Sequence, residues 1–178
     1  MENRLIAVRL SAQQLSDPRF DDPRALVRWM GAVQAQDYKA VRWAVGIRLR
    51  TASLRAVNRA LERGEILRTH VMRPTWHLVA AEDIRWMLRL SARRIRSANS
   101  SLARSRGLGI DDGMYSRSNR LIEKMLRGNL CLTKRQIADR FQAAGIAADT
   151  HFMTRYLMQA EADGIVCSGP DRAGQFTY

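Results

Sequence analysis

The chain has 178 residues, with 30 Lys or Arg against 17 Asp or Glu, so its formal net charge at pH 7 is +13. This length suffices for one ordinary domain or two small ones. The sequence contains no run of 18 apolar residues and no apolar leader, so we expect neither a membrane protein nor a secreted one but a soluble, cytoplasmic, nucleoid-associated protein. Cys131 and Cys167 fit no metal-binding spacing and indicate reduced thiols.

The positive charge is concentrated in the first part of the chain. Residues 1–100 carry 19 basic and 9 acidic side chains, a net +10, whereas residues 101–178 carry 11 and 8, a net +3. Such a field attracts polyanions. Arg supplies 27 of the 30 cations. Its forked guanidinium suits phosphate and base edges, although a bias toward Arg codons explains the ratio of Arg to Lys equally well. The charge predicts a nucleic-acid partner.

The first part of the sequence predicts helices followed by a β-hairpin. We expect a short helix over Leu5–Leu15, a second helix that begins at Asp22-Pro23 and runs into residues 34–37, and helices over 39–48 and 53–63. Residues 66–72 and 75–79 have the pattern of strands joined across Arg73-Pro74. This order is the outline of a winged helix, although many α+β domains share it.

A second unit with the same order of elements follows. A long helix is predicted over 82–104, and the glycine-rich residues 105–113 are the best candidate boundary. Helices over 114–127, 132–144 and 150–163 then lead to strands that begin at 164–167 and at 175–178, so that the chain stops within the second wing. The predicted fold is mainly α with small β-hairpin wings (α+β), in tandem winged helix-turn-helix units. Its expected divisions are 1–81, 82–110 and 111–178.

Four arginines form a stripe along the long helix. Spacings of three and four residues place Arg85, Arg89, Arg93 and Arg96 along one side of that helix. Aligned like charges repel one another unless an anion neutralises them, which favours a phosphate track over a solvated face.

Two further groups of polar residues are candidates for chemistry. Gln34 and Gln36 are neither strong bases nor nucleophiles, but their amides can position and polarise a water; alternatively, both are solvated or capping groups. The hairpin carries His70 and His77 without a third ligand at a matching spacing, which argues against a metal site. His77 can act as a neutral hydrogen-bonding group or proton carrier, and it can equally be a packed hairpin histidine.

The run Leu67–Met87 closely resembles a signature of the bacterial winged-helix family typified by the AlkZ and YcaQ DNA glycosylases. Upstream, Gln34-Ala35-Gln36 resembles that family's Gln-x-Gln motif, in the AlkZ-like form rather than the Gln-x-Asp form. Members are about twice this length and end in a β-barrel-like domain, so the chain resembles their N-terminal half. It departs from the family at Pro74-Thr75-Trp76, where a small residue and Thr-Leu are more usual; Trp76 would narrow or reshape the pocket.

The resemblance implies a monofunctional glycosylase that excises N-alkylated purines from double-stranded DNA, alkylated or crosslinked, as a monomer without a metal or other cofactor. Some members unhook interstrand crosslinks, and others have no assigned activity, so a non-catalytic winged-helix DNA-binding or regulatory protein is the alternative. The implied catalytic residues, which would hold the water that attacks C1′, are Gln34 and Gln36. The residues expected beside the substrate are His77, Thr75 and Trp76. The residues expected on DNA are Arg68, Arg73, Arg85, Arg89, Arg93 and Arg96.

Overall fold

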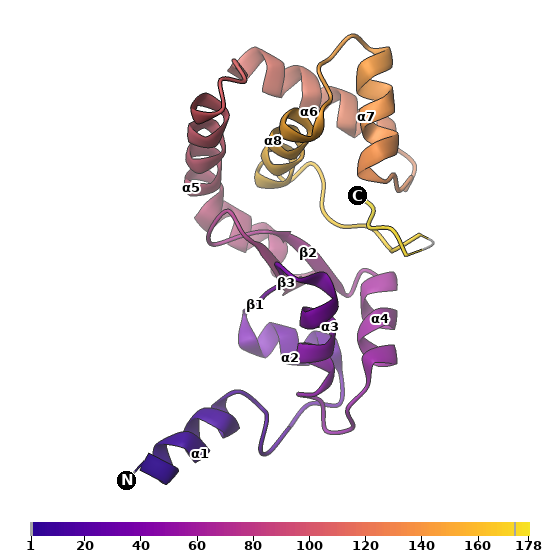
Figure 1. The fold of residues 1–178 in the computed structure, drawn as a ribbon. Helices are drawn as coiled ribbons and strands as arrows, with labels where there is room; N and C mark the ends of the chain where they lie inside the picture. The colour runs from indigo at the N-terminus through magenta and orange to yellow at the C-terminus, as the bar shows by residue number, and fades with distance from the viewer. Residues whose placement is uncertain (1, 173) are drawn as a thin grey trace.

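Eight helices and one three-stranded sheet form the part of the chain that the computed structural model describes, residues 2–172 and 174–178 (Figure 1). In chain order the elements are α1 (Glu2–Ala12), α2 (Pro23–Met30), β1 (Ala32–Gln34), α3 (Tyr38–Gly46), α4 (Leu54–Glu62), β2 (Ile66–His70), β3 (Trp76–Ala80), α5 (Ile84–Ser105), α6 (Asp112–Leu126), α7 (Lys134–Ala143) and α8 (Thr150–Ala162). The predicted α+β class is confirmed. Within the described residues, no helix combines the length and the apolar character needed to cross a bilayer.

The first unit packs three helices on one face of the sheet. The strands are antiparallel in the order β1-β3-β2, so β3 is central and the other two are edges. Ile66 and Leu78, on one face of the sheet, join the buried core formed with α2, α3 and α4. The helix starts follow from local sequence, because Asp22, Asp37 and Ser53 each accept hydrogen bonds from the first turn of the helix that they precede.

Helix α5 belongs to both units. Its first turns place Met87 and Leu88 against Val79 on the other face of the sheet. Further along, Ala92 and Ile95 pack against Met158 and Ala162 of α8. The long helix predicted over 82–104 is therefore a shared element that presents successive apolar surfaces to the sheet and to the second unit.

The helix predicted to run into residues 34–37 ends earlier than expected. Helix α2 stops at Met30, and Gly31 has a φ of 77°, a conformation that glycine adopts without steric strain. Residues Ala32–Gln34 then form β1 and pair with β3. The prediction was wrong here because three residues are too few to show a strand period, and the partner strand lies more than 40 residues away.

In residues 164–172 and 174–178, the strands expected for a second wing are also absent as regular elements. Among the described residues after α8, only the isolated bridges Thr133–Thr177 and Arg172–Gln175 are present. The segment instead follows the free edge of β2, where the Ser168 N–H donates to the Arg68 carbonyl at 3.2 Å and the Arg68 N–H donates to Ser168 Oγ at 2.7 Å. Polar backbone groups of the edge strand are thereby satisfied by the second unit.

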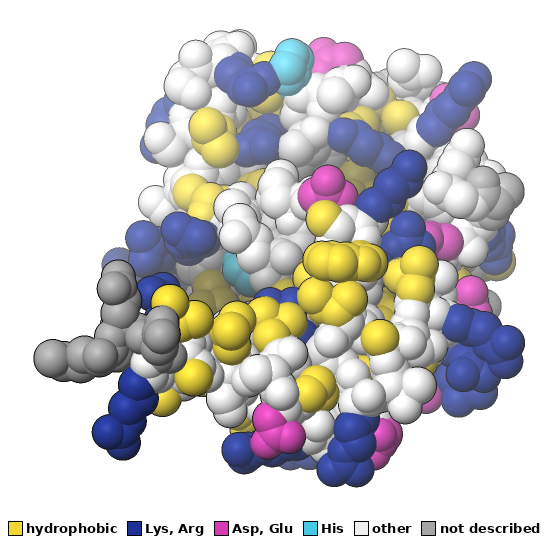
Figure 2. Space-filling model, turned by 60° about the horizontal axis from the view of Figure 1, so that its bottom comes forward, with side chains coloured by type: hydrophobic (Ala, Val, Ile, Leu, Met, Phe, Trp, Pro, Cys, Tyr) yellow, Lys and Arg dark blue, Asp and Glu magenta, His cyan; other side chains and the backbone are white. Residues whose placement is uncertain are grey.

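Helix α1 extends away from the rest of the first unit (Figure 1). Its Leu5, Ile6 and Val8 side chains are exposed, as is Trp29 of α2. On the face shown in Figure 2, hydrophobic side chains form a band flanked by Lys and Arg.

Candidate functional site

The two glutamines lie at one end of the sheet, beside the turn of the β2–β3 hairpin. Gln34 ends β1 and is the Cα partner of His77 in β3, so both side chains project from the same face. The Ala35 N–H donates to the Trp76 carbonyl at 2.7 Å, and Gln36 Oε1 accepts from the Trp76 N–H at 3.4 Å. Both glutamine side chains are exposed. The arrangement places two amides and one imidazole at the same end of the sheet.

His77 is held in one tautomer. Its Nδ1 lies 2.9 Å from the Thr75 carbonyl, which can only accept, so Nδ1 carries the hydrogen and Nε2 of the neutral ring is left as an acceptor. Burial lowers the pKa of His77, and electrostatic interaction with the nearby Arg73 and His70 lowers it further, against the opposing effect of the Thr75 carbonyl. The ring is therefore neutral at pH 7 and offers a lone pair on the face that it shares with Gln34.

Thr75 and Trp76 have different surroundings. The Thr75 hydroxyl is buried and has no hydrogen-bond partner within the described residues. Trp76 alternates with His77 along the strand and points the other way. Its ring lies 3.9 Å from that of His70 and 5.6 Å from that of Phe176, between centroids.

Arg68 was expected on the DNA backbone, but its side chain is buried, with 9% of the residue surface exposed. Its Nε and Nη2 both donate to the Ala35 carbonyl, at 3.1 and 2.9 Å, and Nη2 also approaches the Gln36 carbonyl at 3.4 Å. The guanidinium thus contacts the backbone carbonyls of Ala35 and Gln36, within the candidate glutamine motif, and is turned away from solvent.

The remaining arginines predicted on DNA are exposed, but they do not form one group. Arg73 lies in the hairpin turn, close enough to His77 to affect its pKa. Arg85, Arg89 and Arg96 line a groove of about 810 Å³ between α5 and residues 162–167, at the β2 edge of the sheet. Arg93 lies outside this groove.

Within the groove, Arg96 is paired with Asp163 at 2.8 Å, whereas no ion pair is found for Arg85 or Arg89 in the described part of the chain. Because β1 and β2 are opposite edges, the structure separates this groove from Gln34 by the width of the sheet.

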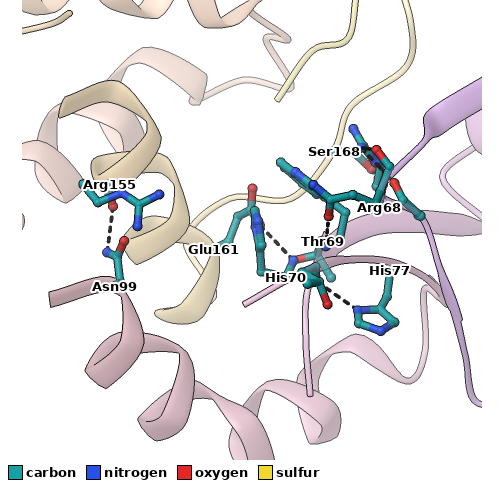
Figure 3. A network of polar contacts seen from close by, with 12 residues as sticks. Arg68, Thr69, His70, His77, Asn99, Arg155, Glu161 and Ser168 are labelled. Carbon is teal, nitrogen blue, oxygen red and sulfur yellow. Dashed lines mark hydrogen bonds and ion pairs between the residues drawn. The ribbon is translucent and has the colours of Figure 1, made fainter. Parts of the chain in front are cut away.

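A buried polar network that sequence reasoning missed joins the two units (Figure 3). Glu161 of α8 is fully buried, and its Oε2 accepts from His70 Nδ1 at 2.6 Å and from the His70 N–H at 2.9 Å. The Thr69 hydroxyl lies 3.4 Å from the same oxygen. The partners are more than 90 residues apart, so no local spacing could have indicated the contact.

Metal ligands do not converge anywhere in residues 2–172 or 174–178: no group of three His, Cys, Asp or Glu side chains is placed to hold an ion. Asp37, next to Gln36, uses its carboxylate to cap α3, accepting from the N–H groups of Lys39 and Ala40 at 2.9 Å each.

Comparison with known proteins adds a family and a fold. A family model described as DNA glycosylase AlkZ-like matches residues 27–178. Among solved structures, the chain is similar to Streptomyces sahachiroi DNA glycosylase AlkZ, with a TM-score of 0.75 and 22% sequence identity. The similarity covers 95% of this chain and 46% of that one, so the chain spans less than half the length of its structural relative. A comparison with curated protein sequences finds no match.

Proposed function

Since the chain belongs to the AlkZ-like DNA glycosylase family, we propose that it excises N-alkylated purines from double-stranded DNA as a monofunctional glycosylase. Gln34 and Gln36 hold the water that attacks C1′ of the damaged nucleotide. The observation that carries the proposal is the pairing of Gln34 with His77 across the sheet, next to the Gln36 amide. The two glutamines are exposed at this end of the sheet, which a duplex can approach, while His77 is buried beside them in β3.

The chemistry required of such a site is modest. Alkylation at N7 of a purine puts positive charge on the base and makes it a good leaving group, so a strong general acid is unnecessary. Charge then develops on the sugar, and amide carbonyl oxygens aimed at it stabilise the transition state electrostatically. This accounts for a site built on amides, without paired carboxylates.

His77 has the properties of a water-positioning base in this scheme. Its neutral ring leaves Nε2 as an acceptor for a water proton, while the Thr75 carbonyl holds the other nitrogen in place.

The DNA backbone is proposed to contact the exposed arginines on α5 and in the hairpin turn. Arg73 lies in the hairpin turn, near His77, and Arg85 and Arg89 line the groove at the β2 edge of the sheet. Guanidinium groups contact phosphates without reading sequence, so they orient the duplex for a lesion-specific site.

The test is incubation of the full chain with duplex DNA carrying one N7-methylguanine, followed by detection of the free base and of the abasic site. We expect base release without strand cleavage until alkali is added, and no release from the unmodified duplex. A second substrate with an interstrand crosslink between alkylated purines asks whether such lesions are also unhooked. Strand cleavage that accompanies release would contradict the monofunctional assignment.

The alternative is a non-catalytic DNA-binding protein. The net charge of +13 and the exposed arginines are equally expected of such a protein. Tight, salt-dependent binding of both duplexes with no release of base would support it over the glycosylase.

A further inference from the structure

Arg68 has an unusual environment for a cation. It lies in the middle of β2, buried, and the described residues provide no carboxylate partner to form an ion pair with it. Burying an arginine without a counterion is unfavourable unless other groups satisfy it. The contacts that compensate for the burial of Arg68 therefore indicate its role.

Its main contact is the central peptide of the Gln34-Ala35-Gln36 segment. Two of its N–H groups converge on the Ala35 carbonyl, at 2.9 and 3.1 Å, while the Ala35 N–H donates to the Trp76 carbonyl at 2.7 Å. Ala35 is thus fixed on both sides, by the neighbouring strand and by Arg68. Rotation of this residue would move both glutamine side chains, so these bonds hold their relative position.

Three aromatic rings enclose the guanidinium. Its Cζ lies 4.3 Å from the Trp76 centroid, 5.0 Å from that of Tyr38 and 5.2 Å from that of Phe176. Ring faces attract cations and restrict the guanidinium to one orientation. They come from β3, from α3 and from the last residues of the chain, so the second unit supplies one wall of the cage.

The cage is itself fixed by polar contacts from the second unit. The Tyr38 hydroxyl donates to Asp171 at 3.3 Å, and Ser168 bonds both backbone groups of Arg68. Burial, together with the negative charge of Asp171, raises the pKa of Tyr38 to about 12, so the hydroxyl keeps its hydrogen over the physiological range.

We infer that Arg68 is a positioning residue, which holds the Gln34-Ala35-Gln36 segment in its working conformation through the Ala35 carbonyl, within a cage that the C-terminal segment completes. The inference rests on the proposed function for its catalytic consequence. The effect of Arg68 on the conformation of the Gln34-Ala35-Gln36 segment can also be tested without an activity measurement. Among residues 168–172 and 174–178, none is hydrogen-bonded to either glutamine, so this segment then acts on the site only through the cage.

The test compares Arg68→Met and Arg68→Lys with Arg48→Met in the full chain. Arg48 is a matched control, because it is a half-buried arginine whose Nη1 donates to a backbone carbonyl, that of Ala44, at 2.6 Å, away from the sheet end. Three quantities are measured: the single-turnover rate of N7-methylguanine release at saturating DNA, the salt dependence of the dissociation constant, and amide hydrogen exchange of residues 34–38.

For Arg68→Met we expect a rate at least 10-fold lower, an unchanged salt slope, and faster exchange confined to residues 34–38 and the segment after residue 165. Arg68→Lys should recover part of the rate, because one donor can still reach the Ala35 carbonyl, and Arg48→Met should leave all three quantities as in the wild type. If Arg68→Met fails to fold, Phe176→Leu removes one cage wall at similar volume, and a smaller effect of the same kind is expected.

A lower salt slope with an unchanged rate at saturating DNA would overturn the inference and make Arg68 a phosphate contact. Unchanged exchange at residues 34–38 would overturn it as well. If the wild type releases no base, the proposed function fails, but the exchange measurement still decides whether Arg68 holds the segment.

Discussion

His77 is the residue whose protonation state matters most at the end of the sheet. It faces Gln34 across the ladder, with Nδ1 committed to the Thr75 carbonyl and Nε2 left as an acceptor. Its pKa is lowered chiefly by burial, so the acceptor persists at neutral pH.

Replacing His77 by Asn tests the role of Nε2 separately from that of Nδ1. The Asn amide can still donate to the Thr75 carbonyl but has nothing at the Nε2 position, so we expect base release to slow by about 100-fold, the scale of a lost general base. DNA affinity should change less than about 2-fold, because the neutral ring carries no charge for a phosphate. Single-turnover release and fluorescence anisotropy give the two quantities. His151→Asn, at an exposed histidine of the second unit, is the control; equal slowing in both variants would remove His77 from the mechanism.

The lowered pKa of His77 also makes stability depend on pH. Between its pKa in the folded protein and the unfolded value of about 6.5, the unfolded chain binds more protons than the folded chain. The neutral His77 ring therefore contributes its full share to the free energy of unfolding above about pH 6.5. This share decreases as the pH falls from about 6.5 through the pKa of His77 in the folded protein. Urea unfolding from pH 8 to pH 5 should show a steeper loss for the wild type than for His77→Asn. Parallel curves would show that His77 titrates alike in both states.

Helix α5 serves both the fold and the proposed contact with DNA. Its inner surface packs first on the sheet and then on α8, which leaves its arginines on the outside. These are not equivalent, because Arg96 is paired with Asp163 while Arg89 and Arg93 are not paired within the described residues.

Removing Arg89 and Arg93 together should weaken DNA binding alike for all sequences. Each phosphate contact contributes about 0.9 to the slope of log K against log salt, so Arg89→Ala/Arg93→Ala should flatten that slope by about 2. Titrations of two unrelated duplexes at several salt concentrations measure this. Arg120→Ala/Arg127→Ala removes the same net charge from two exposed positions at α6 and should leave the slope nearly unchanged. Similar slopes in the wild type and the α5 variant would place α5 away from DNA.

The helices were largely predictable because their signals are local. Ser53 and Thr133 are capping residues readable from sequence, and the spacing of the four arginines of α5 placed them along one side, where all four are exposed. The strand β1 was not predictable, because Gly31 ends α2 and only pairing with β3 makes the next three residues a strand. The residues after α8 show the opposite error, because strands were predicted there and did not form. Their local pattern suited a strand, but tertiary packing placed them along β2.

At the scale of the whole molecule, the two units are joined by buried polar contacts as well as by α5. Glu161 receives the hydrogen bonds of His70 in an interior with little solvent, and its second oxygen has no partner among the described residues. We expect such a pair to fix how the units dock, since a displaced partner would remain buried and unsatisfied.

Glu161→Gln should lower the free energy of unfolding by about 1.5–3 kcal/mol, the scale of hydrogen bonds to a charged group. Urea unfolding measures the loss. Asp21→Asn, which breaks the exposed pair between Asp21 and Arg50, is the control, and we expect less than about 1 kcal/mol from it. A loss no larger for Glu161→Gln than for Asp21→Asn would contradict a docking role for the buried pair.

Contacts of this kind set the limit of prediction from sequence. The glutamine motif and the hairpin were found as candidates from their residues, but the burial of Arg68 depends on rings from three separate segments. The position of Glu161 beside His70 likewise arises only when α8 packs against the first unit.

The central claim is that Gln34 and Gln36 hold the attacking water at the end of the sheet. It is tested most directly by single-turnover release of N7-methylguanine from a duplex by the wild type and by Gln34→Ala/Gln36→Ala, with DNA affinity measured in parallel. We predict a loss of about 100- to 1,000-fold in the rate, the scale of lost transition-state stabilisation, with affinity nearly unchanged because neither amide carries charge. Release at the wild-type rate by the double variant would contradict the claim.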